Sequence, residues 1–123
     1  MSVMADIYAA LRSDASLTSK LAGGEKGIYH LHSPDAGSYP IIVYSTLSDV
    51  PALHANNAEI GRRVTARIHI VTRDGQHGGI YADVGRIMRG LGFMRAQTHE
   101  IYANGLVILA ADYTKAVGLD DGE

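Results

Sequence analysis

Residues 62–91 constrain the fold more than any other part of the chain. Apolar and polar residues alternate over 62–73, which is the period of a β-strand with one buried face. Asp74 and Gly75 form a turn signal, and the apolar residues of 78–91 then recur at helical spacing. The two apolar faces predict a helix packed on a sheet. They consist of Val64, Ala66, Ile68 and Ile70 on the strand and Ile80, Val84, Ile87, Met88 and Leu91 on the helix.

The rest of the chain supplies one more amphipathic helix and several strands. An apolar stripe predicts a helix over 2–11, with Ser2 as its N-cap, and a short helical turn over 17–21 follows. Strands are expected at 28–31, 41–47, 93–102 and 107–113, the last two joined by an Asn104-Gly105 turn. Because residues 41–47 are apolar on both faces, they should be buried on both sides or lie at an interface.

This order predicts an α+β fold, with a mostly antiparallel sheet of about five strands and two main helices on one face. The elements run α-β-β-β-α-β-β. The 123 residues fit a single domain, 1–123. Mobile loops are expected near 32–39, which is rich in turn residues, and near 50–61, which shows no period. The acidic end, 118–123, should fray.

Composition excludes several classes of protein. The chain has no cysteine, so it has neither a disulfide framework nor a thiolate metal site. No apolar run approaches the roughly 18 residues of a membrane span, and the N-terminus lacks the basic start of a secretory signal. The formal charge of −2 argues against a dedicated nucleic-acid binder. Residues 59–95 nevertheless carry seven arginines against three acids, either as a solvated surface or as a basic face for an acidic partner.

The sequence contains no complete catalytic, cofactor or metal motif. His30 and His32 could supply two metal ligands, but no third or fourth ligand accompanies them. Asp112 is a lone carboxylate on an apolar strand, and no nucleophile motif is present. Residues 75–79 precede a helix but lack the lysine of a phosphate-binding loop. We therefore expect no catalytic residue, no cofactor and no metal, and a protein that is not an enzyme.

The aromatic composition and the pattern of two strands favour a surface for assembly with other chains. The aromatic residues are seven tyrosines and one phenylalanine, and tyrosine is common where one end of the ring is buried and the other is wet. The basic strand and the two-sided apolar strand supply the candidate interface. Its residues are Arg62, Arg63, Arg67, Tyr39, Tyr44, Ile41 and Val43.

The layout resembles the tail-completion, or tail-terminator, proteins of long-tailed bacteriophages and prophages. The segments that carry the resemblance are IYAALRSDASLTSKLAG at 7–23, GIY at 27–29, YPIIVYSTLSD at 39–49, RRVTARIHIVTRDG at 62–75 and GGIYADVGRIMRGL at 78–91. They cover nearly the whole chain in order. The short segment after Gly92 and the plain acidic end depart from the family pattern, which leaves the docking mode of the C-terminus open.

The resemblance implies a structural virion protein that forms a ring, commonly a hexamer, at the head-proximal end of the tail tube. Such a ring stops tube growth and joins the tail to the head. The implied partners are other copies of the chain, the tube protein and a head–tail connector or stopper protein, while DNA passes through the lumen without sequence-specific binding. The implied location is the virion tail, assembled in the host bacterial cytoplasm, with no membrane and no cofactor.

Two other functions remain open at this stage. A small α+β ligand-binding domain or enzyme could use a cone-shaped pocket lined by His30, His69, His99 and Asp112. A nucleic-acid or regulatory binding module could use the basic residues of 62–95.

Overall fold

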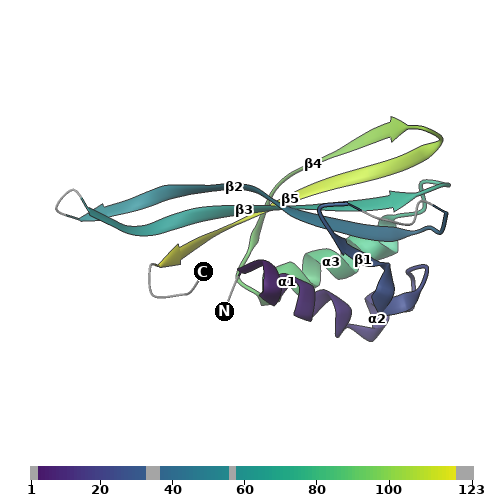
Figure 1. Ribbon diagram of the computed structural model, residues 1–123, viewed down its shortest axis with the longest axis horizontal. Coiled ribbons are helices and arrows are strands. Elements are labelled where there is room, and N and C mark those ends of the chain that lie inside the picture. Colours follow the sequence, from purple (N-terminus) through teal and green to yellow (C-terminus); the bar gives the residue numbers. More distant parts are fainter. Residues whose placement is uncertain (1–2, 33–36, 56–57, 119–123) are drawn as a thin grey trace.

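A five-stranded sheet with helices on one face forms the structure (Figure 1). The computed structural model describes residues 3–32, 37–55 and 58–118. The strand order is β1-β2-β3-β5-β4; β1 pairs with β2 in parallel, and the other pairs are antiparallel. The predicted fold class and element order are confirmed. The elements are α1 (Val3–Arg12), α2 (Ala15–Thr18), a 3₁₀ turn η1 (Gly24–Gly27), β1 (Ile28–His30), β2 (Ile41–Ala55), β3 (Ala58–Thr72), α3 (Gly78–Gly90), β4 (Met94–Ala103) and β5 (Leu106–Gly118).

The core lies between the sheet and the helices, where the sequence pattern places it. Ile68 and Ile70 on β3 are fully buried, as are Val84 and Met88 on α3. Ile7 and Leu11 of α1 join the same cluster. Leu91, just beyond the end of α3, is only partly buried. The period-two face of β3 and the helical stripe of α3 thus pack on each other as predicted.

Short-range polar contacts fasten the small helix α2 to α3. Asp14 caps α2 by accepting a hydrogen bond from the Leu17 amide at 3.0 Å. The Arg86 guanidinium of α3 donates to both oxygens of the same carboxylate, at 2.9 and 3.0 Å. Asp83 of α3 pairs with Lys20 at 2.7 Å. The pKa values of both aspartates are lowered, in each case mainly by the hydrogen bond from the basic side chain.

The loop predicted near 50–61 is wrong over its described part, because residues 50–55 belong to β2 and residues 58–61 to β3, while 56–57 lie outside the described residues. β2 and β3 stay paired from Asp49↔Val64 out to Ala55↔Ala58, and this hairpin projects past the helices as a long arm (Figure 1). The backbone register shifts after Thr46, Pro51 and Leu53, as it does where a β-bulge adds a residue to one strand. The bulges therefore erase the alternation by which a strand is recognised in sequence.

Pro51 is tolerated in this arm because β2 has little support on its other side. β1 pairs with Ile42, Val43 and Tyr44, and no strand among the described residues pairs with the outer edge of β2 at Pro51. Proline lacks an amide donor and is accepted at such edges.

The last hairpin follows the sequence signal at its turn. Asn104 and Gly105 both have positive φ, 55° and 76°, as a type I′ turn requires. β5 continues to Gly118, five residues beyond its predicted end, where Gly118 pairs with Gly61. The Ser2 cap, residues 33–36 of the predicted loop at 32–39, and residues 119–123 of the predicted frayed end lie outside the described residues.

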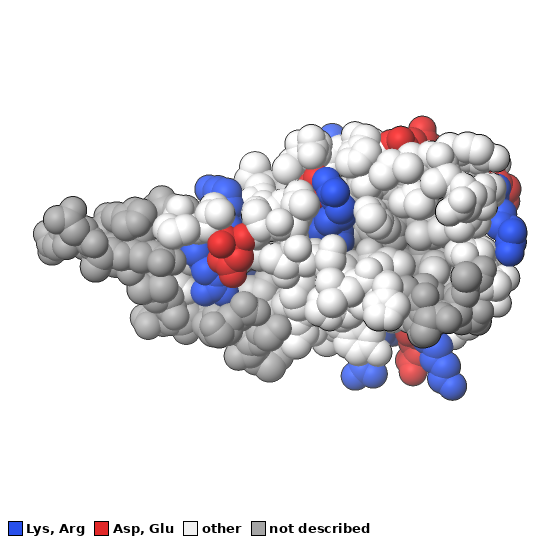
Figure 2. Space-filling view, turned by 45° about the horizontal axis from the view of Figure 1, so that its top comes forward, with Lys and Arg blue, Asp and Glu red and all other residues white. Residues whose placement is uncertain are grey.

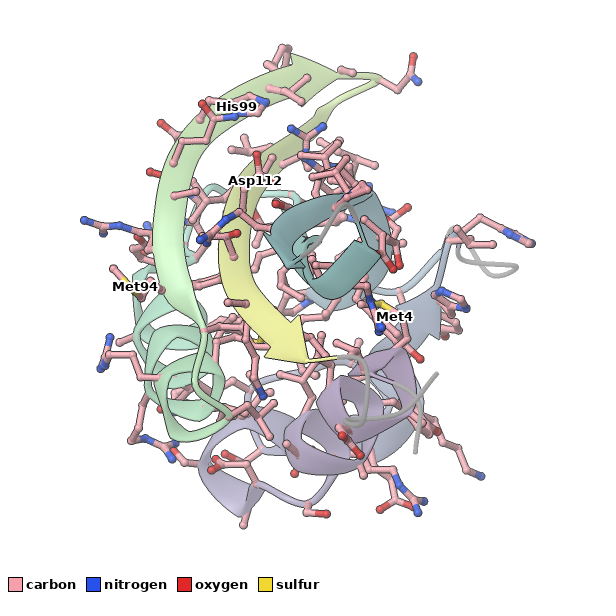
Figure 3. All side chains as sticks on the ribbon, turned by 90° about the vertical axis from the view of Figure 1, so that its left-hand side faces the viewer. Met4, Met94, His99 and Asp112 are labelled. Carbon is pink, nitrogen blue, oxygen red and sulfur yellow. The ribbon has the colours of Figure 1, made fainter. Side chains whose placement is uncertain are left out.

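The second face of the sheet is concave, because the β4–β5 hairpin curls over it. Figure 3 shows Asp112 and His99 on the concave side of this hairpin, whereas Met94 lies on the convex side. Within 3–32, 37–55 and 58–118, no helix has the length and apolar character needed to cross a membrane.

Candidate assembly surfaces

The apolar part of the predicted interface is mostly inside the protomer. Tyr44 is 6% exposed and stacks on Tyr8 and His30, with ring centroids 6.1 and 4.8 Å apart. Ile41 is also buried, while Val43 and Tyr39 are partly exposed. Tyr44 and Ile41 therefore stabilise the protomer and offer little surface to another chain.

The three candidate arginines do not form one patch. The Arg62 side chain is 12% exposed, and its Nε lies 3.1 Å from an Asp49 carboxylate oxygen. Arg67 pairs with Asp112 within the sheet. Arg63 is exposed at the base of the β2–β3 arm, opposite Val50. Arg63 is thus the candidate arginine best placed to meet another chain.

A buried polar network occupies the concave face. Asp112 is 1% exposed and accepts hydrogen bonds from Arg67 Nε at 2.8 Å, Arg67 Nη2 at 3.0 Å and Gln97 Nε2 at 2.9 Å. The Arg67 hydrogen bond outweighs burial and lowers the Asp112 pKa. A carboxylate held ionised by a bidentate arginine serves the packing of β3, β5 and β4 and is poorly suited to accept a catalytic proton.

The four residues expected to line a cone-shaped pocket are not all brought together. His69 and His99 are brought near Asp112, but His30 stacks on Tyr44. None of the four lines the cavity described below. Among the described residues, no three metal-binding side chains cluster together.

His69 makes stability depend on pH. Its pKa is lowered from 6.5, first by burial and then by Arg67 and His99, against the opposing effect of Asp112. Because the unfolded chain binds this proton at higher pH than the folded chain, stability should fall as the pH drops below about 6.5. We expect the melting temperature to decrease between pH 7.5 and 5.5, and His69→Gln to flatten that slope. An equal slope in the variant would contradict this role of His69.

Two surfaces with exposed apolar side chains remain. β4 is an edge strand with exposed Met94, Ile101 and Tyr102, the last 76% exposed. The β2–β3 arm exposes Leu47 and Val50 at its base. In Figure 2 the charged side chains on the visible face are scattered, some of them as neighbouring blue and red groups, and most of the described surface is uncharged. An open strand edge with apolar side chains is a ready site for chain–chain contact.

A cavity of about 490 Å³ lies between α3, the start of β4 and β5. Arg95 Nη1 donates a hydrogen bond of 2.6 Å to the Tyr81 hydroxyl at its rim. The Tyr113 hydroxyl is buried there and has no hydrogen-bond partner among the described residues. Burial raises the pKa of Tyr113 to about 12, so the phenol stays protonated. The sequence carried no signal for this cavity, whose walls include Tyr81, Gly85, Arg89, Phe93, Arg95 and Tyr113.

Comparisons with known proteins identify a matching family and a similar fold. The family model described as tail completion protein gp17 matches residues 5–122. A chain from the structure titled "Virion of native gene transfer agent (GTA) particle" superposes with a TM-score of 0.68 at 12% sequence identity, over 95% of each chain. At that identity the likeness shows a shared fold. A comparison with curated proteins gave no significant match.

Proposed function

Because this chain belongs to the tail completion protein gp17 family of phage virion structural proteins, we propose that it closes the head-proximal end of the tail tube as a ring and joins the tail to the head. The family match over residues 5–122 is the observation that carries this proposal. The proposed partners are other copies of this chain, commonly six in a ring, the tube protein and a connector or stopper protein. DNA passes through the lumen without sequence-specific binding, and assembly takes place in the host cytoplasm.

The shape of the protomer supports ring formation. A closed ring needs head-to-tail contacts, in which two different patches of the same chain meet. The β2–β3 arm and the β4 edge are the candidates for these patches, because both expose apolar side chains and they lie on different strands. Asp112 is engaged in an ion pair with Arg67 inside the protomer, and no metal-binding cluster occurs among the described residues. Neither observation supports an enzymatic function.

Arg63 should influence assembly without influencing folding. Because it is exposed, Arg63→Glu should leave the melting temperature nearly unchanged. An interfacial charge mainly sets association rate and its salt dependence, so we expect joining of heads to tails to slow by about tenfold at low salt and less at high salt. Lys26→Glu, an exposed reversal on η1, is the matched control. Equal joining rates for the two variants would show that Arg63 does not contribute to the interface. Arg67 cannot be tested in this way because its reversal would unpair Asp112.

Addition of purified protein to particles that lack it tests the proposal. Extracts of the encoding phage or prophage without this gene should contain free heads and free tails. Adding the purified chain should produce joined virions and restore infectivity, and an image of a tail end should show an added ring. A lack of any gain in joined particles would refute the proposed role.

A further inference from the structure

The cavity between α3, β4 and β5 contains a buried hydroxyl that has no hydrogen-bond partner among the described residues. The Tyr113 side chain is 1% exposed, and its hydroxyl lines the cavity without a hydrogen-bond partner among the described residues. A buried polar group left without a partner is costly, so such a group commonly marks a site completed by a ligand or partner. Arg89 and Arg95 supply guanidinium groups on the same walls.

The chemistry of these donors fits a carboxylate. Guanidinium groups bind carboxylate oxygens with charge-assisted, often bidentate hydrogen bonds, and a neutral phenol can add a third donor. None of the described residues that line the cavity is acidic, so no internal carboxylate is shown competing for these donors. Phe93 and Met94 give the rest of the wall an apolar character.

We propose that, in the ring put forward above, this cavity binds the acidic segment 119–123 of a neighbouring copy of the chain. Asp120, Asp121 and Glu123 give this segment three carboxylates, and no lysine or arginine occurs after Lys115. The charge of the segment thus complements that of the cavity. The proposal rests on the proposed function, because it requires several copies in contact.

The reach of the chain favours a neighbouring copy over the same copy. Tyr113 and Gly118 are five residues apart on β5, which is about 16 Å along a strand. Asp120 and Asp121 follow Gly118 by two and three residues, and extended chain covers at most about 3.6 Å per residue. A segment that first has to reverse direction cannot bring these carboxylates back to the Tyr113 hydroxyl. Binding between copies also joins two different patches, as a ring requires.

Two glycines of α3 provide a matched pair of variants. A Cβ at Gly85 would lie 3.2 Å from Arg89 Nη1 and 3.8 Å from the Tyr113 hydroxyl, so Gly85→Ala narrows the cavity. A Cβ at Gly90 would meet nothing within 4 Å, so Gly90→Ala is the control. Alanine favours helix at both positions, so loss of folding is not expected to confuse the comparison.

The first experiment measures binding of a synthetic peptide to the full chain by NMR. The peptide carries residues 117–123, and the amides of α3 and early β4 should shift with a saturating dose dependence. Arg89→Glu should weaken binding by about 30-fold or more, and Gly85→Ala by about tenfold, whereas Gly90→Ala should have no effect. A peptide with Asp120→Asn and Asp121→Asn should bind as weakly as the wild-type peptide binds Arg89→Glu. A lack of shifts at the cavity at millimolar peptide would overturn the proposal.

The second experiment separates binding between copies from binding within one copy. An Arg89→Glu chain is mixed with a chain carrying Asp120→Asn and Asp121→Asn, and the masses are measured by analytical ultracentrifugation. Each mixed pair keeps one intact contact, so we expect dimers in the mixture and monomers of either chain alone. No dimer in the mixture, with wild-type rings intact, would overturn the proposal. Peptide binding without wild-type rings on tube ends would instead contradict the proposed function and leave the cavity assignment standing.

Discussion

Replacing Arg67 with alanine should destabilise the folded chain by about 3–5 kcal/mol, because it leaves a buried carboxylate without its counter-charge. Asp112 is 1% exposed and receives two of its three hydrogen bonds from Arg67. A loss of this size is a large share of the roughly 5–15 kcal/mol that stabilises a domain. Urea denaturation at pH 7 measures it directly.

A double variant distinguishes an unpaired charge from a loss of packing. Arg67→Met with Asp112→Leu removes both charges and keeps similar volume, so it should be close to the wild type in stability or above it. If the double variant is as unstable as Arg67→Ala, the packing of these side chains matters more than their charge. If Arg67→Ala costs less than about 1 kcal/mol, water reaches Asp112 and the network is weaker than its geometry indicates.

Ile68→Ala should cost about 2–5 kcal/mol through lost burial and the cavity that remains. Ile68 of β3 is fully buried on the face of the sheet that the helices cover. It is flanked by the paired strands β2 and β5, which limit how far the structure can close around the cavity. Val50→Ala on the exposed base of the arm is the control, with an expected cost below about 1 kcal/mol. Denaturant midpoints of the two variants provide the comparison, and similar midpoints would contradict the placement of the core.

Regular periodicity made much of the fold predictable. The alternation from Val64 to Ile70 and the helical stripe of α3 each have one buried face, so a pattern in the chain maps directly onto burial. The β2–β3 arm was missed because its bulges shift the side-chain alternation. Such a strand is held by hydrogen bonds between main chains, and these do not produce an alternating pattern of apolar and polar residues in the sequence.

The candidate surfaces were less predictable because they depend on register between distant segments. Arg67 and Asp112 are neighbours only because β3 and β5 pair with Arg67 opposite Asp112. Nothing in the local sequence around either residue encodes that register. Tyr44 was predicted to be an interface residue because both faces of its strand are apolar. In the structure its ring stacks on Tyr8 and His30 within one protomer.

Electron microscopy of a lysate that lacks this gene tests the central claim most directly. If the chain closes the head-proximal end of the tail tube, heads and tails should accumulate separately, and some tubes should exceed the normal length. Expression of the wild-type chain from a plasmid should restore joined virions with tails of uniform length. Normal virions in the absence of the chain would contradict the account.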